Sequence, residues 1–302
     1  MILEETYTLA NGVEIPKLGL GTWFISDQDV VQAVQDAARI GYRHIDTAQA
    51  YQNERGVGEG IRACGVNRED MFVTTKLAAE VKSYKEAVSS IDQSLQTLGL
   101  DYVDMMIIHS PQPWTEFGGE DRCLVGNCEA WRALEDAYHA GKLRAIGLSN
   151  FEEVDVENIC DSCSVKPMVN QILAHISNTP KELIEYAQGK GILVEAYSPI
   201  GHGELLRNRQ VAKIAEEYGV TIPQLSIRYL LQLGLLPLPK TANPECIIRS
   251  MPTIDSDGCR PPVLDDAVHS FRWHDVQFFR GTGTGGRLGS ESVDDMLRNL
   301  KG

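Results

Sequence analysis

Four side chains in the first half of the chain combine the groups needed to protonate a carbonyl oxygen: Asp46, Tyr51, Lys76 and His109. A phenol, whose pKa is about 10, is a poor acid at neutral pH unless a neighbouring cation favours its ionised form. Lys76 supplies a cation that Asp46 can pair with, and His109 can orient a substrate oxygen. Because none of the four delivers a hydride, the set predicts a carbonyl reductase that uses a nicotinamide cofactor.

These residues lie at or just after the ends of short apolar segments with strand character. Eight such segments are nearly continuous apolar runs, as expected for parallel strands buried on both faces. Patterns with apolar residues three and four apart separate them, for example over residues 30–40, 87–98 and 130–138. Eight βα units in about 240 residues predict an α/β fold, a (β/α)8 TIM barrel. The predicted strands are residues 18–23, 43–48, 71–77, 102–110, 143–150, 168–173, 192–199 and 235–241.

The segments between the strands carry turn and capping signals. Asn11-Gly12 predicts a two-residue hairpin turn in an N-terminal hairpin that forms a cap or a lid. Asn150 is expected to cap the helix after the fifth strand. Glycines at four helix ends are expected to be left-handed: Gly41, Gly99, Gly141 and Gly191. We expect a barrel over residues 1–250 and an atypical tail over 251–302. Because the tail has little periodicity, it is interpreted as a divergent, partly disordered segment or as the product of a reading-frame change. Its GTGTGG stretch lacks the preceding strand of a dinucleotide-binding turn, which favours a tail loop.

The later strand ends suit a cofactor, since the C-terminal ends of barrel strands form one mouth. Ser149, Asn150 and Gln171 offer the hydroxyl and amide groups that a carboxamide needs. The ring of Tyr197 can stack on a nicotinamide, although a core aromatic residue fits the same position. After the eighth strand, Lys240 and Thr241 can meet phosphate.

Composition excludes several classes of function. The chain has 28 Lys and Arg against 42 Asp and Glu, a net charge of −14, which argues against nucleic acid as a partner. The absence of an apolar run of about 20 residues and of a signal peptide predicts a cytoplasmic protein without a membrane partner.

Seven cysteines, an odd number scattered along the chain, are typical of free thiols. A zinc site at Cys123, Cys128, Cys160 and Cys163 is an alternative, but no His lies at a ligand spacing, so no metal is expected.

Eight ordered stretches resemble the aldo-keto reductases, particularly bacterial members of the 2,5-diketogluconate reductase type, over residues 5 to about 250. They are LGLGTW, RHIDTAQAYQNE, VTTKL, IIHSP, GLSNF, VNQI, AYSPIG and LPLPKTANPE. The resemblance implies NADPH-dependent reduction of aldehydes, dicarbonyls or keto sugars, with NADH as an alternative cofactor. It implies that Tyr51 is the general acid, that Lys76 and Asp46 support it, and that His109 orients the substrate.

The resemblance also assigns binding residues. Those expected to bind the cofactor are Ser149, Asn150, Gln171, Tyr197, Ser198, Lys240 and Thr241, and those expected to line the substrate pocket are Trp23, His109 and Trp114. Trp114 fits equally well as a loop residue packed on the barrel rim. Members of this family are often monomers, and no exposed apolar stripe in this sequence argues for more.

Two departures from the family pattern open an alternative function. Cys246, Arg249 and Ser250 stand where the family usually places Arg or His, Glu and Asn to grip the adenosine end of the cofactor. The tail over 252–302 replaces the usual closing helix and substrate loop. The alternative is therefore a nicotinamide-cofactor-binding, redox-responsive interaction protein with little turnover.

We predict that Cys246→Arg tightens NADPH binding more than NADH binding, by about 1–2 kcal/mol, because a guanidinium forms a charge-assisted hydrogen bond with the 2′-phosphate. Fluorescence titration of both cofactors measures the change. Equal effects on the two cofactors would remove position 246 from the phosphate site.

Overall fold

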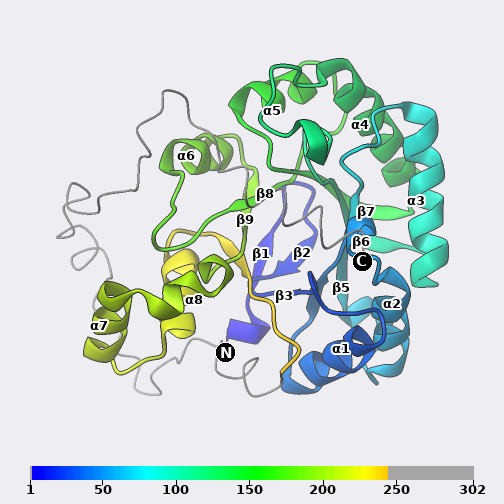
Figure 1. Cartoon of the computed structure of the whole chain (residues 1–302). Helices are drawn as coiled ribbons and strands as arrows, with labels where there is room; N and C mark the ends of the chain where they lie inside the picture. The colour runs from blue at the N-terminus through cyan, green and yellow to red at the C-terminus, as the bar shows by residue number, and fades with distance from the viewer. Residues whose placement is uncertain (1, 244–302) are drawn as a thin grey trace.

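Eight parallel strands form one sheet at the centre of the molecule, in the order β10-β9-β8-β7-β6-β5-β4-β3. A parallel bridge between Gly21 and Lys240 joins the two edge strands, so the sheet closes into a barrel. Helices surround the strands (Figure 1). The predicted (β/α)8 barrel is confirmed. The computed structural model describes residues 2–243, so the predictions for the tail, and for Cys246, lie outside the described residues.

Each barrel strand falls within a different one of the eight predicted segments. The strands are β3 (Leu20–Gly21), β4 (His44–Asp46), β5 (Phe72–Leu77), β6 (Val103–Ile108), β7 (Leu143–Ser149), β8 (Val169–Leu173), β9 (Leu193–Tyr197) and β10 (Leu236–Leu238). The α-helices are α1 (Asp29–Ile40), α2 (Glu54–Ala63), α3 (Tyr84–Leu98), α4 (Leu124–His139), α5 (Glu153–Cys160), α6 (Lys181–Gly189), α7 (Arg209–Glu217) and α8 (Ile222–Gln232). Short 3-10 helices lie at η1 (Ile2–Glu4), η2 (Gln49–Tyr51), η3 (Arg68–Asp70), η4 (Trp114–Glu116) and η5 (Gly201–Arg207).

An N-terminal hairpin, β1 (Thr6–Thr8) with β2 (Glu14–Pro16), closes the base of the barrel. Tyr7 donates a hydrogen bond to the carbonyl of Leu235, and Asn11 donates one to the carbonyl of Arg144, both at the amino-terminal ends of strands. The hairpin is therefore a cap at the end opposite the strand carboxyl ends. The predicted two-residue turn is wrong, because a backbone bond from Leu9 to Val13 encloses a three-residue loop.

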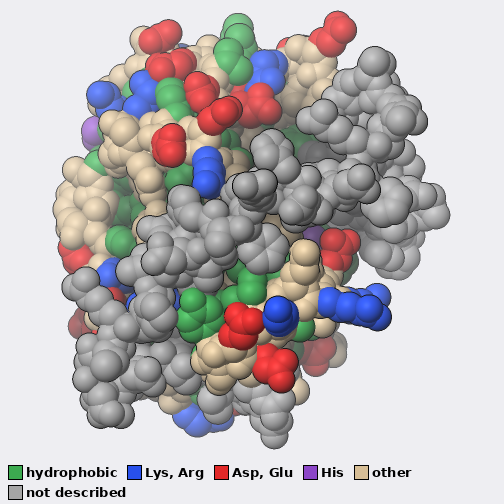
Figure 2. Space-filling model, turned by 90° about the vertical axis from the view of Figure 1, so that its left-hand side faces the viewer, with side chains coloured by type: hydrophobic (Ala, Val, Ile, Leu, Met, Phe, Trp, Pro, Cys, Tyr) green, Lys and Arg blue, Asp and Glu red, His purple; other side chains and the backbone are tan. Residues whose placement is uncertain are grey.

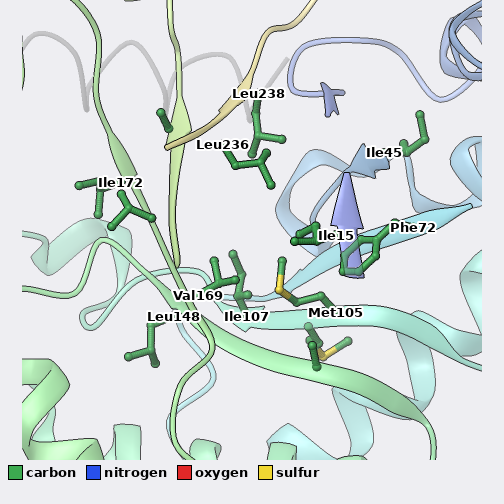
Figure 3. Close-up of a cluster of buried hydrophobic side chains, with 14 of the residues drawn as sticks. Ile15, Ile45, Phe72, Met105, Ile107, Leu148, Val169, Ile172, Leu236 and Leu238 are labelled. Atoms are coloured by element: carbon green, nitrogen blue, oxygen red, sulfur yellow. The ribbon is translucent and has the colours of Figure 1, made fainter. Parts of the chain in front are cut away.

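The register of the strands decides which side chains face the barrel interior. Side chains alternate between the two faces of a strand, and register partners on neighbouring strands share a face. Lys76 is the partner of Ile107, and Gln171 is the partner of both Ser149 and Glu195. Lys76, Ser149, Gln171 and Glu195 therefore face the barrel interior toward the carboxyl ends of the strands. Apolar side chains fill the interior toward the amino-terminal ends. Labelled members of this core are Ile15, Phe72, Met105, Ile107, Val169, Leu236 and Leu238 (Figure 3).

Helix ends agree with the sequence in one respect and differ in another. The four glycines expected to be left-handed have φ values of 116°, 63°, 76° and 74° at Gly41, Gly99, Gly141 and Gly191. Asn150, however, does not cap α5. Glu152 is the N-cap and forms a capping box with Asp155. The Asn150 side chain bonds instead to the strand ends, as described below.

Acidic and basic side chains are interspersed on the face shown in Figure 2. On this face the negative net charge does not form a region of one sign. Within residues 2–243, no helix has the length and apolar composition needed to cross a membrane.

Gly19 is required where the first strand segment passes close to the barrel interior. A Cβ at this position would lie 2.6 Å from both His44 Nδ1 and Leu238 Cδ2. We predict that Gly19→Ala destabilises the protein by about 1–3 kcal/mol through overpacking. Gly189→Ala is the matched control, because a Cβ there contacts nothing within 4 Å and alanine favours the helix. Urea unfolding measures the free energy of unfolding of both variants. A Gly19→Ala protein as stable as the wild type would contradict the prediction.

Candidate active site

A buried ion pair forms the centre of the strand carboxyl ends. Lys76 Nζ lies 2.5 Å from Asp46 Oδ1, and it also donates to the Thr47 carbonyl at 2.9 Å. The Lys76 side chain is fully buried. Burial lowers its pKa, but the Asp46 charge and the hydrogen bonds to Asp46 and Tyr51 outweigh that effect, so the pKa of Lys76 is raised overall. The ammonium therefore stays charged inside the barrel.

Tyr51 reaches this ion pair from η2, the turn that follows β4. Lys76 Nζ donates to the Tyr51 hydroxyl at 3.3 Å. Gln49 fixes the turn, because its Oε1 accepts from the Ala78 backbone and its Nε2 donates to Ser94. Asn53, fully buried, accepts from Thr47 and anchors the end of the turn. The sequence did not identify Gln49 or Asn53, since their roles depend on side-chain contacts that no spacing reveals.

The pKa of Tyr51 differs in direction from the expected one. Burial raises it above its ordinary value, and the lowering effect of the Lys76 charge does not compensate. The phenol is therefore protonated at neutral pH. The Lys76 charge makes ionisation of this buried phenol less costly than it would be without a cation. This effect matters during a reaction, when negative charge develops as the proton leaves.

His109, at the end of β6, lies beside Tyr51 and is held by aromatic contacts. Its ring is 5.6 Å from the Tyr51 ring and 5.1 Å from the Trp114 ring, both edge to face. Burial and the Lys76 charge hold the pKa of His109 well below its ordinary value. The imidazole is therefore neutral at pH 7 and has one N–H to donate. Trp114 also contacts Phe117, with 5.7 Å between the ring centroids, and its place in a substrate pocket stays a prediction.

A second group of predicted residues joins the first through hydrogen bonds. Asn150 Nδ2 donates to the His109 carbonyl at 3.0 Å, and Asn150 Oδ1 accepts from the Tyr197 hydroxyl at 2.9 Å. Ser149 Oγ donates to the backbone carbonyl of Gln171 at 2.9 Å. The Gln171 side chain donates to Asp46 Oδ2 at 2.9 Å. Residues from β4, β7, β8 and β9 thus form one network around the ion pair.

A model of the aldo/keto reductase family matches residues 17–252. The chain belongs to the aldo/keto reductase family. As a member it is an oxidoreductase that acts on carbonyl groups, which confirms the predicted family and enzyme class. The predicted 2,5-diketogluconate type stays a prediction.

The reductase is similar to known proteins along most of its length. It is 40% identical over 254 residues to the glyoxal reductase of Bacillus subtilis (strain 168), covering 84% of this chain and 88% of that protein. An aldo/keto reductase from Brucella melitensis has a TM-score of 0.75 at 37% identity, covering 83% of this chain and 92% of that one. A Bombyx mori aldo-keto reductase in complex with NADP has a TM-score of 0.76 at 33% identity, covering 88% and 92%.

The remaining predicted residues lie around this network. Ser198 contacts His202, with 3.3 Å between Oγ and Nε2, and Trp23 packs edge to face on His202 at 5.3 Å. The sequence did not identify His202, which lies four residues after Ser198 in η5. Lys240 and Thr241 follow β10: Lys240 pairs with Gly21 where the barrel closes, and its side chain is exposed. Thr241 Oγ1 accepts a hydrogen bond from the Asn243 backbone at 3.1 Å.

The cysteines of the zinc alternative do not gather a ligand set. Within residues 2–243, no group of three or more His, Cys, Asp or Glu residues could hold a metal ion. The thiols of Cys123, Cys128, Cys160 and Cys163 are free and half-buried. The structure therefore gives the zinc alternative no support.

One ionisable residue of the reductase's network was missed by the sequence interpretation. Glu195 is the only charged residue of β9, and it is fully buried inside the barrel. Its Oε2 accepts from Gln171 Nε2 at 2.8 Å. Burial, reinforced by the Asp46 charge, raises the pKa of Glu195 to about 8. A charged residue within an otherwise apolar strand was the available signal.

We predict that this carboxyl makes the stability of the reductase fall between about pH 4.5 and pH 8. The folded protein keeps a proton that the unfolded chain releases, so the free energy of unfolding decreases as pH rises through this window. Glu195→Gln cannot ionise and should remove a decrease on the order of 3 kcal/mol between pH 5 and pH 8. Urea unfolding at both pH values measures it, with exposed Glu120→Gln as control. An unchanged pH dependence in Glu195→Gln would contradict the prediction.

Proposed function

We propose that the protein is an NADPH-dependent reductase of aldehydes, dicarbonyls or keto sugars, with Tyr51 as the general acid. The observation that carries the proposal is the contact of the Tyr51 hydroxyl with the buried, charged Lys76 ammonium, beside the neutral His109. A carbonyl oxygen next to these two rings would meet a phenol O–H and an imidazole N–H. Such donors stabilise the negative charge that develops on the oxygen.

The residues around the ion pair fit a nicotinamide cofactor. Both N–H bonds of the Gln171 amide are engaged, which leaves its carbonyl oxygen to accept from a carboxamide NH2 group. Ser149 and Asn150 lie on the neighbouring strand end, and the half-buried ring of Tyr197 offers a stacking surface. The reduced nicotinamide, when bound, supplies the hydride that no side chain of this site can supply. The relative from Bombyx mori, solved with NADP, supports the choice of a phosphorylated cofactor.

Each of the four central side chains has a separate proposed role. Tyr51 transfers its proton to the substrate oxygen as charge develops there, and Lys76 stabilises the phenolate that remains. Asp46 holds the ammonium in place, and His109 orients the carbonyl. Because the pKa of Tyr51 is raised by burial, the acid form is present before each turnover.

Aromatic side chains line the proposed substrate pocket. Trp114 stacks edge to face on His109, and Trp23 lies beside His202. The related glyoxal reductase of Bacillus subtilis acts, by its name, on a small dicarbonyl, so a dicarbonyl is the first substrate to test. A cytoplasmic location and a monomeric state stay predictions from the sequence.

We predict that Tyr51→Phe lowers kcat for NADPH-dependent reduction about 10²- to 10⁴-fold, the usual contribution of a general acid. NADPH binding should be nearly unchanged, because the hydroxyl acts only when charge develops on the substrate oxygen. Methylglyoxal and an aromatic aldehyde are suitable substrates, and fluorescence quenching measures cofactor binding.

Tyr186→Phe is the matched control, since Tyr186 lies on α6 and bonds to the Glu153 carbonyl away from the site. It should keep wild-type activity. Full activity in Tyr51→Phe would remove Tyr51 from the acid role. Cofactor binding without turnover in the wild type would favour the redox-responsive binding protein instead.

A further inference from the structure

The side-chain amide of Gln171 is held by two carboxyl groups, Glu195 from the adjacent strand β9 and Asp46 from β4, which lies four strands away in the barrel. Its Nε2 donates to Asp46 Oδ2 at 2.9 Å and to Glu195 Oε2 at 2.8 Å. An amide nitrogen has two protons, so both are used. Only the carbonyl oxygen of Gln171 is left for a ligand, and it can only accept.

Asp46 alone would leave one amide proton of Gln171 free. With one proton free, the amide could present a donor to a bound ligand as well as an acceptor. Glu195 lies beside Gln171 on the adjacent strand and accepts a hydrogen bond from the second amide proton. That proton is then not available to a ligand. Its other register neighbour, Leu236, is apolar.

We propose that Glu195 is a positioning residue, which fixes the Gln171 amide so that its oxygen accepts from the carboxamide NH2 group of the nicotinamide. The inference rests on the proposed function, since it assumes that a nicotinamide cofactor binds beside Gln171. It gives a role to Oε2 of the one carboxyl group in the otherwise apolar strand β9, where a polar group with no task would only be costly.

Glu195 performs this task as a neutral acid at pH 7. The charged groups that face it are Asp46 from β4, which raises its pKa, and Lys76 from β5, which lowers it. The pKa of Glu195 is about 8, so the protonated form predominates at pH 7 and its carbonyl oxygen accepts from Gln171. Glutamine has the same shape and charge as this form, and it also offers a carbonyl oxygen. Methionine fills a similar volume without an acceptor of comparable strength.

The test compares two cofactors that differ only at the group read by Gln171. NADP⁺ carries a carboxamide, whereas its 3-acetylpyridine analogue keeps the carbonyl oxygen and lacks the NH2 donors. Titration calorimetry at pH 7 gives the dissociation constant of each for the wild type, Glu195→Gln and Glu195→Met. We expect the wild type to favour NADP⁺ roughly five-fold, the ratio expected for one neutral hydrogen bond.

The two variants should separate the positioning role from general packing. Glu195→Gln should keep the preference, and Glu195→Met should bring the ratio close to one by weakening NADP⁺ alone. A wild-type ratio of one, an unchanged ratio in Glu195→Met, or loss of the preference in Glu195→Gln would overturn the inference while leaving the reductase proposal standing. Failure of the wild type to bind either cofactor would overturn both.

A second measurement needs no substitution that removes the carboxyl group. In the NMR spectrum of the wild type without cofactor, the Gln171 side-chain NH2 protons should exchange with solvent at least about ten-fold more slowly than those of exposed Gln210, because two buried acceptors hold them. Loss of the signal in Gln171→Leu assigns it. Equally fast exchange would overturn the inference.

Discussion

The structure depends on the ion pair between Lys76 and Asp46 inside the barrel. Burying an ammonium costs several kcal/mol unless a counter-charge and hydrogen bonds replace its hydration. Asp46 and the Thr47 carbonyl provide both, and Asp46 uses its second oxygen to bind Gln171. The same carboxylate therefore keeps the cation charged and connects the proton-donor side of the network to the amide side.

The ion pair also explains the electrostatics of its neighbours. The Lys76 charge, added to burial, lowers the pKa values of His109 and His44, the latter to about 3. The Asp46 charge, added to burial, raises the pKa of Glu195. One charged pair is thus surrounded by groups that are held neutral, which is the least costly way to place several ionisable side chains in one water-poor interior.

The barrel and its central residues could be predicted from the sequence because each depends on local patterns. Buried parallel strands are continuous apolar runs, and Asp46, Lys76 and His109 each mark the end of one. Three features could not be read in this way. Asn150 looked like a helix cap, but its amide bonds to His109 and Tyr197. Glu195 and its partner Gln171 meet only because of strand register. The pKa of Tyr51 depends on the depth of burial, which no spacing reveals.

The N-terminal hairpin gives the barrel two ends with separate tasks. At the base, Tyr7 and Asn11 of the hairpin donate hydrogen bonds to the backbone carbonyls of Leu235 and Arg144. Leu3 of η1 packs near Gly41 in a loop at that same end. The proposed site lies at the opposite end, where the strand carboxyl ends meet. A fusion partner or a surface tether attached at the amino terminus would therefore leave the mouth open to small molecules, which makes this the preferable point of immobilisation.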